Sequence, residues 1–297
     1  MTSRPLRGVI AAVPTPLRPG MLQPDPERFT KLCRQVLDAG CDGLNLCGTT
    51  GEAASFSVEQ RMALMSAAAA RLPLDRCIVG TGAASVADAL ALTRRAADLG
   101  FAGALLLPPF YYPGIDVAGL LRFFAPIVEA TAATPIPLYL YNVPADSKVA
   151  YTREFVRALR ERFGPERIAG LKDASGVTTL AIELAQAWPD FDVFPSDEAC
   201  LPDARAGRFA GCISASAAVS APYCRKAWMD GDAAALDTAN RLRAVVSRRG
   251  LIAGVRAVCA ELFGDASYAE PMPPLLPLPP QERQALMAEY RAVQAGR

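Results

Sequence analysis

Residues 137–172 read PLYLYNVPADSKVAYTREFVRALRERFGPERIAGLK and contain one full repeat of the pattern that organises the chain. The apolar run 137–141 predicts a short strand. Thr152 then opens an amphipathic helix, and the apolar run 168–172 predicts the next strand. Both runs are apolar on both faces, which is typical of buried parallel strands. This stretch therefore predicts two parallel strands joined by a helix.

The same alternation of strand and helix continues in both directions. We expect eight strands, over residues 8–13, 42–47, 77–80, 103–107, 137–141, 168–172, 192–194 and 211–214. A helix follows each strand; the pattern is weakest over 198–206. Eight units in about 230 residues match an α/β fold of the (β/α)₈ TIM-barrel type. A doubly wound sheet alternates in the same way, but the lack of a phosphate-binding fingerprint favours the closed barrel.

The chain after residue 230 has a different character. Residues 233–262 predict a helix that stops at Gly264, and the proline-rich segment 270–280 cannot be helical. A last amphipathic helix begins at Gln281. We therefore expect a catalytic barrel over residues 1–230 and a C-terminal helical extension over 231–297 that packs on it.

Composition excludes several classes of protein. Of 297 residues, 52% are hydrophobic and 21% are charged, which excludes a disordered chain. The net charge of +1 gives no electrostatic footprint for nucleic acid or an anionic membrane. No apolar stretch reaches the length of about 18 residues that a membrane span needs, and the run 8–13 is too short for a signal peptide. We expect a soluble, cytoplasmic protein.

The inventory of reactive side chains is restricted. Histidine is absent, which excludes Ser-His-Asp, Cys-His and His-metal sites. The eight cysteines lack zinc or thioredoxin spacing, so we expect reduced core residues. Asp197 and Glu198 are adjacent carboxylates at a strand end, but no further hard ligand accompanies them, and we predict no metal. They either bind substrate hydroxyls or cap a helix, and the sequence favours neither.

Lys172 is the most informative residue, because active sites of such barrels lie at the carboxyl ends of the strands. Four of the 31 basic residues are lysines, and Lys172 alone ends a predicted strand. Removal of an amine from water favours its neutral, nucleophilic form, which can make a Schiff base with a ketone. The alternative is an ion pair with Asp173 or Glu52. The position favours the nucleophile.

Two further strand ends complete a candidate site. Tyr141 ends the neighbouring strand, about 4.8 Å away, and its phenol can relay protons where histidine is absent. The alternative is a tyrosine that packs in the barrel and finds a hydrogen-bond partner. The turn Gly48-Thr-Thr-Gly51 offers amides and hydroxyls that suit a carboxylate, although it is also compatible with an ordinary turn between strand and helix.

Three motifs stand in an order and spacing that resembles the dihydrodipicolinate synthase / N-acetylneuraminate lyase family. They are Gly48-Thr-Thr-Gly-Glu52, Tyr141-Asn-Val-Pro144 and Lys172-Asp-Ala-Ser-Gly176. The resemblance covers nearly the whole chain, from Gly8 to the final helix. It implies a (β/α)₈ barrel with a C-terminal helical extension, a homotetramer, and a Schiff base between a lysine and pyruvate or a 2-keto acid, without a metal or organic cofactor.

The resemblance also assigns roles to residues of the predicted site. Lys172 resembles the Schiff-base lysine and Tyr141 the proton-relay tyrosine. Thr49 and Thr50, in the turn that begins at Gly48, resemble the residues that contact the pyruvate carboxylate, and Thr49 also joins the relay.

Other positions bear on assembly and substrate. Tyr111 matches a tyrosine that reaches into a neighbouring subunit's site, and Ile213 matches a residue whose carbonyl faces the substrate. Asp146 stands where dihydrodipicolinate synthases carry an arginine for a second carboxylate. Asp197 and Glu198 match a pair that binds sugar hydroxyls.

These features predict a class I (Schiff-base) aldolase or lyase that cleaves or forms the carbon–carbon bond next to pyruvate in a 2-keto-3-deoxy (sugar) acid. Ala174 and Ala215 replace hydroxyl side chains of the sialic-acid lyases, so sialic acid is not favoured. One alternative is 4-hydroxy-tetrahydrodipicolinate (dihydrodipicolinate) synthase. Others are a 2-keto-acid dehydratase or deaminase that uses the same lysine, and a non-catalytic 2-keto-acid-binding protein.

Overall fold

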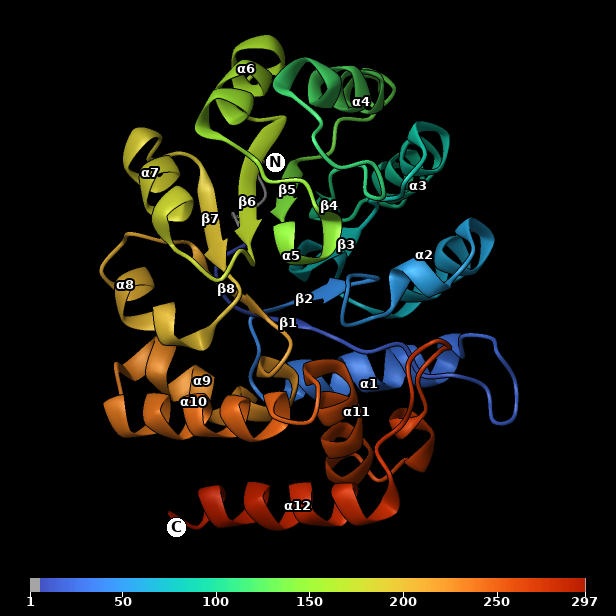
Figure 1. Ribbon diagram of the computed structural model, residues 1–297, viewed down its shortest axis with the longest axis vertical. Helices are drawn as coiled ribbons and strands as arrows, with labels where there is room; N and C mark the ends of the chain where they lie inside the picture. The colour runs from blue at the N-terminus through green and yellow to red at the C-terminus, as the bar shows by residue number, and fades with distance from the viewer. Residues whose placement is uncertain (1–5, 297) are drawn as a thin grey trace.

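The computed structural model describes residues 6–296, in which eight parallel strands alternate with helices (Figure 1). This arrangement confirms the predicted (β/α)₈ barrel. The predicted strand ends differ from those observed by at most two residues. The strands are β1 (Gly8–Ala12), β2 (Gly43–Leu46), β3 (Cys77–Gly80), β4 (Gly103–Leu106), β5 (Leu138–Asn142), β6 (Ile168–Asp173), β7 (Asp192–Pro195) and β8 (Gly211–Ser214).

The strands form one twisted sheet that curls until its edges meet. Their order is β7-β6-β5-β4-β3-β2-β1-β8, and every neighbouring pair is parallel. At the seam between β7 and β8, the Ala210 amide donates a hydrogen bond of 2.9 Å to the Val193 carbonyl. The barrel is therefore nearly closed, and the carboxyl ends of all eight strands point to one rim.

Helices surround the barrel, and several begin at the residue that the sequence indicates. Ser57 and Gln60 form the expected capping box, and Ser85 and Thr152 cap their helices as expected. The helices up to the last strand are α1 (Pro26–Asp38), η1 (Ala53–Ser55), α2 (Val58–Arg71), η2 (Leu74–Arg76), α3 (Val86–Leu99), α4 (Val117–Glu129), α5 (Pro144–Ser147), α6 (Arg153–Phe163), α7 (Thr179–Ala187), η3 (Glu198–Cys200) and α8 (Leu201–Arg205).

The strand alternation creates two apolar layers. One set of strand side chains points outward and packs against the helices, as Val9, Leu44 and Val193 do. The other set fills the barrel interior, where Ile10 and Leu105 belong to a separate cluster. Burial on both sides of each strand explains why the strand segments are apolar throughout.

Two predicted helices differ from those observed. The helix predicted over 233–262 is divided into α10 (Ala233–Ser247) and α11 (Leu251–Leu262), because Gly250 adopts a φ of 86° that a continuing helix does not allow. The helix predicted over 198–206 begins as the 3₁₀ turn η3 and continues as the short α8. Its pattern was weak because so few residues contribute to it.

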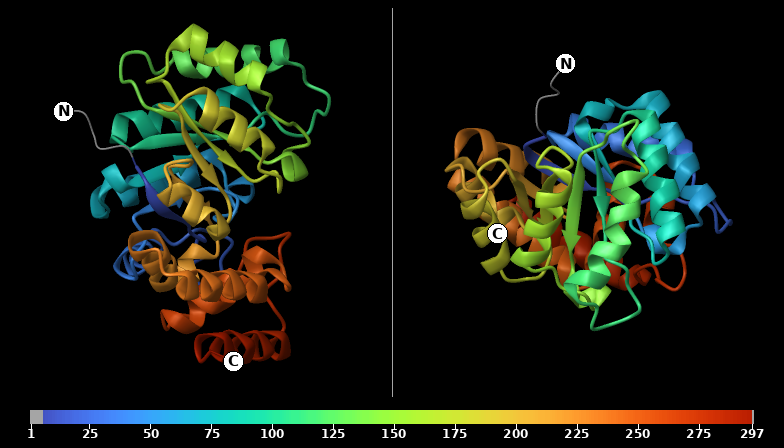
Figure 2. Two further views of the ribbon diagram at one scale, coloured as in Figure 1. Left: turned by 90° about the vertical axis from the view of Figure 1, so that its left-hand side faces the viewer. Right: turned by 90° about the horizontal axis from the view of Figure 1, so that it is seen from above.

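The C-terminal helices gather at one end of the molecule (Figure 2). After α9 (Ala217–Asp230), the chain forms α10, α11, η4 (Ala266–Ala269) and α12 (Pro280–Gln294). The Tyr290 hydroxyl of α12 donates a hydrogen bond to the Val219 carbonyl of α9. We propose a boundary at residue 230, where α9 ends, between a barrel domain over 1–230 and an extension over 231–297. Residues 1–5 and 297 of these ranges lie outside the described residues.

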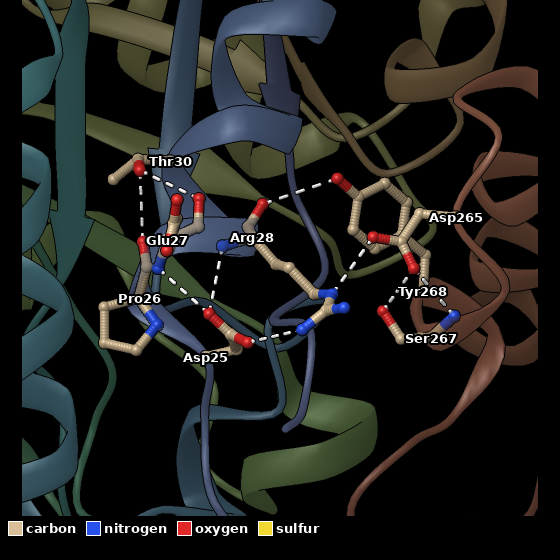
Figure 3. A network of polar contacts seen from close by, with 8 residues as sticks. All are labelled: Asp25, Pro26, Glu27, Arg28, Thr30, Asp265, Ser267 and Tyr268. Atoms are coloured by element: carbon tan, nitrogen blue, oxygen red, sulfur yellow. Dashed lines mark hydrogen bonds and ion pairs between the residues drawn. The ribbon is translucent and has the colours of Figure 1, made fainter. Parts of the chain in front are cut away.

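A polar network joins the first helix to this extension (Figure 3). The Asp25 carboxylate caps α1 by accepting hydrogen bonds of 3.1 Å from the amides of Glu27 and Arg28. The Arg28 guanidinium bridges Asp25, at 2.8 Å, and Asp265, at 3.1 Å, which precedes η4. Burial alone would raise the pKa of Asp25, but the hydrogen bonds and charge of Arg28 outweigh it and lower the pKa.

Two expectations from the sequence concern the cysteines, predicted to be reduced core residues, and the lack of an apolar stretch long enough to span a membrane. All eight cysteines lie buried and unpaired within residues 6–296. Burial raises the thiol pKa, to about 11 at Cys47 and about 12 at Cys259, which keeps these groups protonated at neutral pH. Over the same residues, every helix is too short or too polar to cross a bilayer.

We predict that Asp25→Ala lowers the free energy of unfolding by about 1–2 kcal/mol at pH 7, because α1 loses its cap and Arg28 loses a partner. Urea unfolding measures the difference. A carboxyl with a lowered pKa stabilises the fold above its unfolded pKa and loses this effect as the pH falls through the folded value. The difference from wild type should therefore shrink below about pH 4.

Asp38→Ala is the matched control, because Asp38 is an exposed carboxylate at the opposite end of the same helix. A negative charge there opposes the helix dipole, so we expect no loss of stability. Equal losses in the two variants would contradict the role assigned to the cap.

Candidate active site

Lys172 and Tyr141 lie side by side at the rim of the barrel. They are paired in register on β6 and β5, and both side chains point inward. Lys172 is 4% exposed, and its Nζ lies 4.2 Å from the centroid of the Tyr141 ring. Burial at the rim of the barrel, beside a second reactive side chain, is the placement expected for a nucleophile.

The alternative reading of Lys172 as half of an ion pair does not match the geometry. Glu52 forms its ion pair with Arg256 instead. Asp173 follows Lys172 on β6, but its Oδ1 accepts a hydrogen bond of 2.9 Å from the Asn142 amide. Within residues 6–296, no carboxylate forms an ion pair with Lys172. The amine is therefore not neutralised by a neighbouring anion.

The Tyr141 hydroxyl connects the lysine to the threonine turn. It lies 3.2 Å from Thr49 Oγ1, and the two hydroxyls share a hydrogen bond. This contact meets the expectation that a buried tyrosine finds a polar partner, and it also makes a chain of two hydroxyls beside the amine. Such a chain can carry a proton between groups.

The turn after β2 is held in an unusual conformation. Cys47 and Glu52, on either side of it, both adopt positive φ angles, of 49° and 55°. Within the turn, the Glu52 amide donates to the Thr49 carbonyl at 2.9 Å, and the Ala53 amide donates to the Gly48 carbonyl at 3.2 Å. Non-glycine residues with positive φ are strained and occur often at ligand-binding sites.

A cavity of about 520 Å³ opens beside this turn. It brings together four predicted site residues, Gly48, Thr49, Tyr141 and Asp146, and the segment of Leu275 closes another side. Lys172 does not line the cavity. Its amine lies against the ring of Tyr141, and Tyr141 does line the cavity. Thr50 is buried next to Thr49 and does not line the cavity either.

Asp197 and Glu198 have a different environment from the rest of the site. Asp197 caps η3 and forms an ion pair of 2.8 Å with Arg243 of α10. Glu198 is fully buried and accepts hydrogen bonds from Ser216 at 2.7 Å and from Arg243 at 3.2 Å. Burial raises the pKa of Glu198, against the opposing charge of Arg243. Asp197 thus takes the capping role that was one of its two expected roles.

Two further predicted residues lie apart from the cavity lining. Ile213 of β8 is buried in the inner cluster together with Tyr141. Tyr111 is 82% exposed in the loop after β4, with a φ of 90°, and packs edge-on against Tyr112 at 5.3 Å. It does not line the cavity of its own chain.

Arg256, which anchors the turn from the C-terminal extension, was not among the residues predicted from the sequence. This fully buried side chain of α11 pairs with Glu52 and donates to the carbonyls of Thr15, at 2.7 Å, and Glu270, at 2.9 Å. The second Glu52 oxygen accepts from the Met272 amide at 2.6 Å. A single charge inside the apolar run 251–260 was the available signal, since a buried charge requires a partner.

The comparisons with known proteins agree with this arrangement. Residues 5–293 match the family model described as "Dihydrodipicolinate synthetase family". The chain belongs to the dihydrodipicolinate synthetase family. An "Uncharacterized DapA-like lyase" from Chloroflexus aurantiacus is 32% identical over 98% of each chain. A 4-hydroxy-tetrahydrodipicolinate synthase from Parasynechococcus marenigrum is 32% identical over 89% of this chain and 87% of its own.

Two solved structures superpose on nearly the full chain. Dihydrodipicolinate synthase from Agrobacterium tumefaciens aligns with a TM-score of 0.88 at 25% identity, over 96% of this chain and 99% of its own. KD(P)GA from T. tenax aligns with a TM-score of 0.85 at 25% identity, over 98% of this chain and its full length. As a member of this family the protein is a carbon–carbon lyase.

We predict that Arg256→Met lowers the free energy of unfolding by about 3–5 kcal/mol, because it leaves the Glu52 carboxylate buried without its partner. Urea or thermal unfolding measures the loss. Arg291→Ala is the control, because it breaks an exposed ion pair with Glu261, which should contribute less than about 1 kcal/mol. A loss of similar size in both variants would contradict a special role for Arg256.

Proposed function

We propose that the protein is a class I pyruvate aldolase in which Lys172 forms a Schiff base with a 2-keto acid. The observation that carries the proposal is the buried Lys172 amine on the face of Tyr141, whose hydroxyl reaches Thr49. The three groups supply a nucleophile and a proton path without histidine, thiolate or metal chemistry.

The reaction follows from these groups in the direction of cleavage. The Lys172 amine attacks the keto carbon of the substrate to give a carbinolamine. The Tyr141 hydroxyl then gives its proton to the carbinolamine oxygen, which leaves as water, so that an iminium ion and a Tyr141 phenolate result. The iminium accepts the electron pair of the breaking C3–C4 bond and becomes an enamine. The Tyr141 phenolate takes the proton of the C4 hydroxyl, so that an aldehyde leaves and the phenol is restored. The Tyr141 hydroxyl then protonates the enamine at C3. Water adds to the resulting iminium and returns a proton to the Tyr141 phenolate, which releases pyruvate and the free amine.

The turn and its neighbours orient the substrate for this step. The amides and hydroxyls of Gly48, Thr49 and Thr50 are proposed to bind the carboxylate, and the Ile213 carbonyl to face the substrate. A fixed carboxylate holds the keto carbon at one position relative to the amine, which lowers the entropic part of the barrier. No metal or organic cofactor enters the proposed reaction.

The proposed substrates are 2-keto-3-deoxy acids with several hydroxyls. Asp146 lines the cavity, and its charge repels a second carboxylate. The similarity to KD(P)GA from T. tenax supports this substrate class. Asp197, whose side chain is 47% exposed, is proposed to contribute to binding the hydroxyl-rich end. Glu198 is fully buried on Ser216 and Arg243, so it is proposed to act only by holding Arg243, the partner of Asp197. A second candidate is 4-hydroxy-tetrahydrodipicolinate synthase, the name of several relatives that are 32–36% identical.

The proposal extends to assembly and location. The exposed Tyr111 and Tyr112 form an aromatic pair on an outward loop, as expected of a residue that completes a neighbouring subunit's site. We propose a cytoplasmic homotetramer in which Tyr111 serves the partner's proton relay. The proposed ligand is a small molecule, pyruvate or another 2-keto acid. We propose that the protein binds neither nucleic acid nor a membrane.

We predict that borohydride reduction in the presence of pyruvate attaches one adduct, and that peptide mass mapping finds it on Lys172. Lys172→Ala should give none, because the other three lysines, Lys31, Lys148 and Lys226, are exposed to solvent. Lys226→Ala is the control and should be labelled like wild type. An unmodified wild-type protein would remove the basis for the proposed function.

The substrate class is tested by supplying both kinds of reaction to the same enzyme. We predict that the enzyme releases pyruvate from 2-keto-3-deoxy sugar acids at least ten times as fast as it condenses pyruvate with aspartate semialdehyde. Pyruvate assays measure both rates. Asp146→Asn should narrow this ratio, because it removes a charge that repels the second carboxylate. A wild-type enzyme that prefers aspartate semialdehyde would establish the second candidate instead.

A further inference from the structure

Asn45 of β2 is a polar residue in an otherwise apolar part of the barrel. It is 0% exposed, and neither its Nδ2 nor its Oδ1 has a hydrogen-bond partner among residues 6–296. An unpaired buried amide destabilises a fold by about 1–3 kcal/mol, and almost all buried polar groups in proteins are paired. The reaction described above does not use Asn45, so its presence calls for a reason.

The strand pairing places Asn45 in the same interior layer as Lys172. Layers of such barrels take one side chain from every second strand, and the tilt shifts each layer by one residue from a strand to its neighbour. The next member of a layer is therefore found by moving to the residue paired on the neighbouring strand, advancing one residue along that strand, and repeating both moves once more. The steps run Ile213–Ile10–Ala11–Leu44–Asn45, then Asn45–Ile78–Val79–Ala104–Leu105, then Leu105–Tyr139–Leu140–Leu171–Lys172.

The layer thus consists of Asn45, Leu105, Lys172 and Ile213. Strands β2 and β6 lie opposite each other in a ring of eight, so Asn45 faces Lys172 across the interior. The other two members are apolar and belong to the inner cluster. An eight-stranded barrel is just wide enough for side chains to fill it, which places the amide on the side of the substrate opposite the amine.

Asn45 also lies directly beneath the turn proposed to bind the carboxylate. A Cβ atom added to Gly48 would stand 2.7 Å from Asn45 Oδ1, so the two residues are in close contact. Gly48 in turn lines the cavity together with Thr49 and Tyr141. The unpaired amide therefore has the turn above it and the lysine across from it.

We propose that Asn45 is a further substrate-binding residue, whose Nδ2 donates a hydrogen bond to the carboxylate of the 2-keto acid attached to Lys172. This inference rests on the proposed function and extends the carboxylate site from the turn into the barrel. A donor held inside an apolar layer binds a carboxylate more strongly than one in water, because hydrogen bonds to charged groups are the strong ones. The fold tolerates an unpaired amide because the ligand pairs it.

Asn45→Leu tests the proposal, because it keeps the approximate shape and removes the amide. We expect an unchanged or higher midpoint of thermal unfolding, since an apolar side chain suits this layer better. The pyruvate concentration that gives half-maximal borohydride labelling of Lys172 should rise about tenfold or more. Asn45→Asp, which replaces the donor with a negative charge, should raise it at least as much.

Asn240→Leu is the matched control, because the side-chain oxygen of Asn240 is also buried without a partner, but in α10, outside the barrel. Its half-maximal pyruvate concentration should equal that of wild type. A folded Asn45→Leu or Asn45→Asp protein with wild-type pyruvate dependence overturns this inference and leaves the aldolase proposal intact. A wild-type protein that is not labelled overturns the aldolase proposal itself.

Discussion

The pairing of Tyr141 with Lys172 across β5 and β6 is the constraint on which the site depends. Because the side chains of a strand alternate, a shift of one residue in this register would turn either group out of the barrel and into the helix layer. The neighbouring pair points the other way and secures the register: Asn142 donates to Asp173 at 2.9 Å, and its own oxygen accepts from the Tyr151 amide at 3.1 Å. The inward pair can therefore be reactive while the outward pair holds the strands in place.

The eight strands and many helix starts were predictable, because both depend on local information. A strand buried on both faces must be apolar, and a capping serine such as Ser57 acts within three residues. The partner of Glu52 was not predictable in this way, because Arg256 lies 204 residues further along the chain. From the sequence, Glu52 was a possible ion-pair partner of Lys172, and Asp197 was a possible helix cap. Only the folded chain shows that Arg256 pairs with Glu52 and that Arg243 pairs with Asp197.

The extension contributes to the site through this same pairing. Arg256 holds Glu52 from one side, and the Met272 amide holds it from the other, so the strained turn is fixed by chain segments remote in sequence. The segment around Leu275 also closes part of the cavity. A turn with two non-glycine residues at positive φ persists only where its surroundings determine it, and here the C-terminal helices provide those surroundings.

Some of the buried polar atoms without partners lie close to the proposed site. Among the described side chains, these are the Asn45 amide under the turn and Arg61 Nε at the cavity, whereas Asp173 Oδ2, Arg167 Nε and Asn240 Oδ1 lie outside the barrel interior. Each lowers the stability of the fold, whereas the apolar layers and the paired charges elsewhere raise it. Unpaired groups at the rim are expected if selection there acts on binding rather than on stability, because a group already paired within the protein has no free hydrogen-bonding capacity for a substrate.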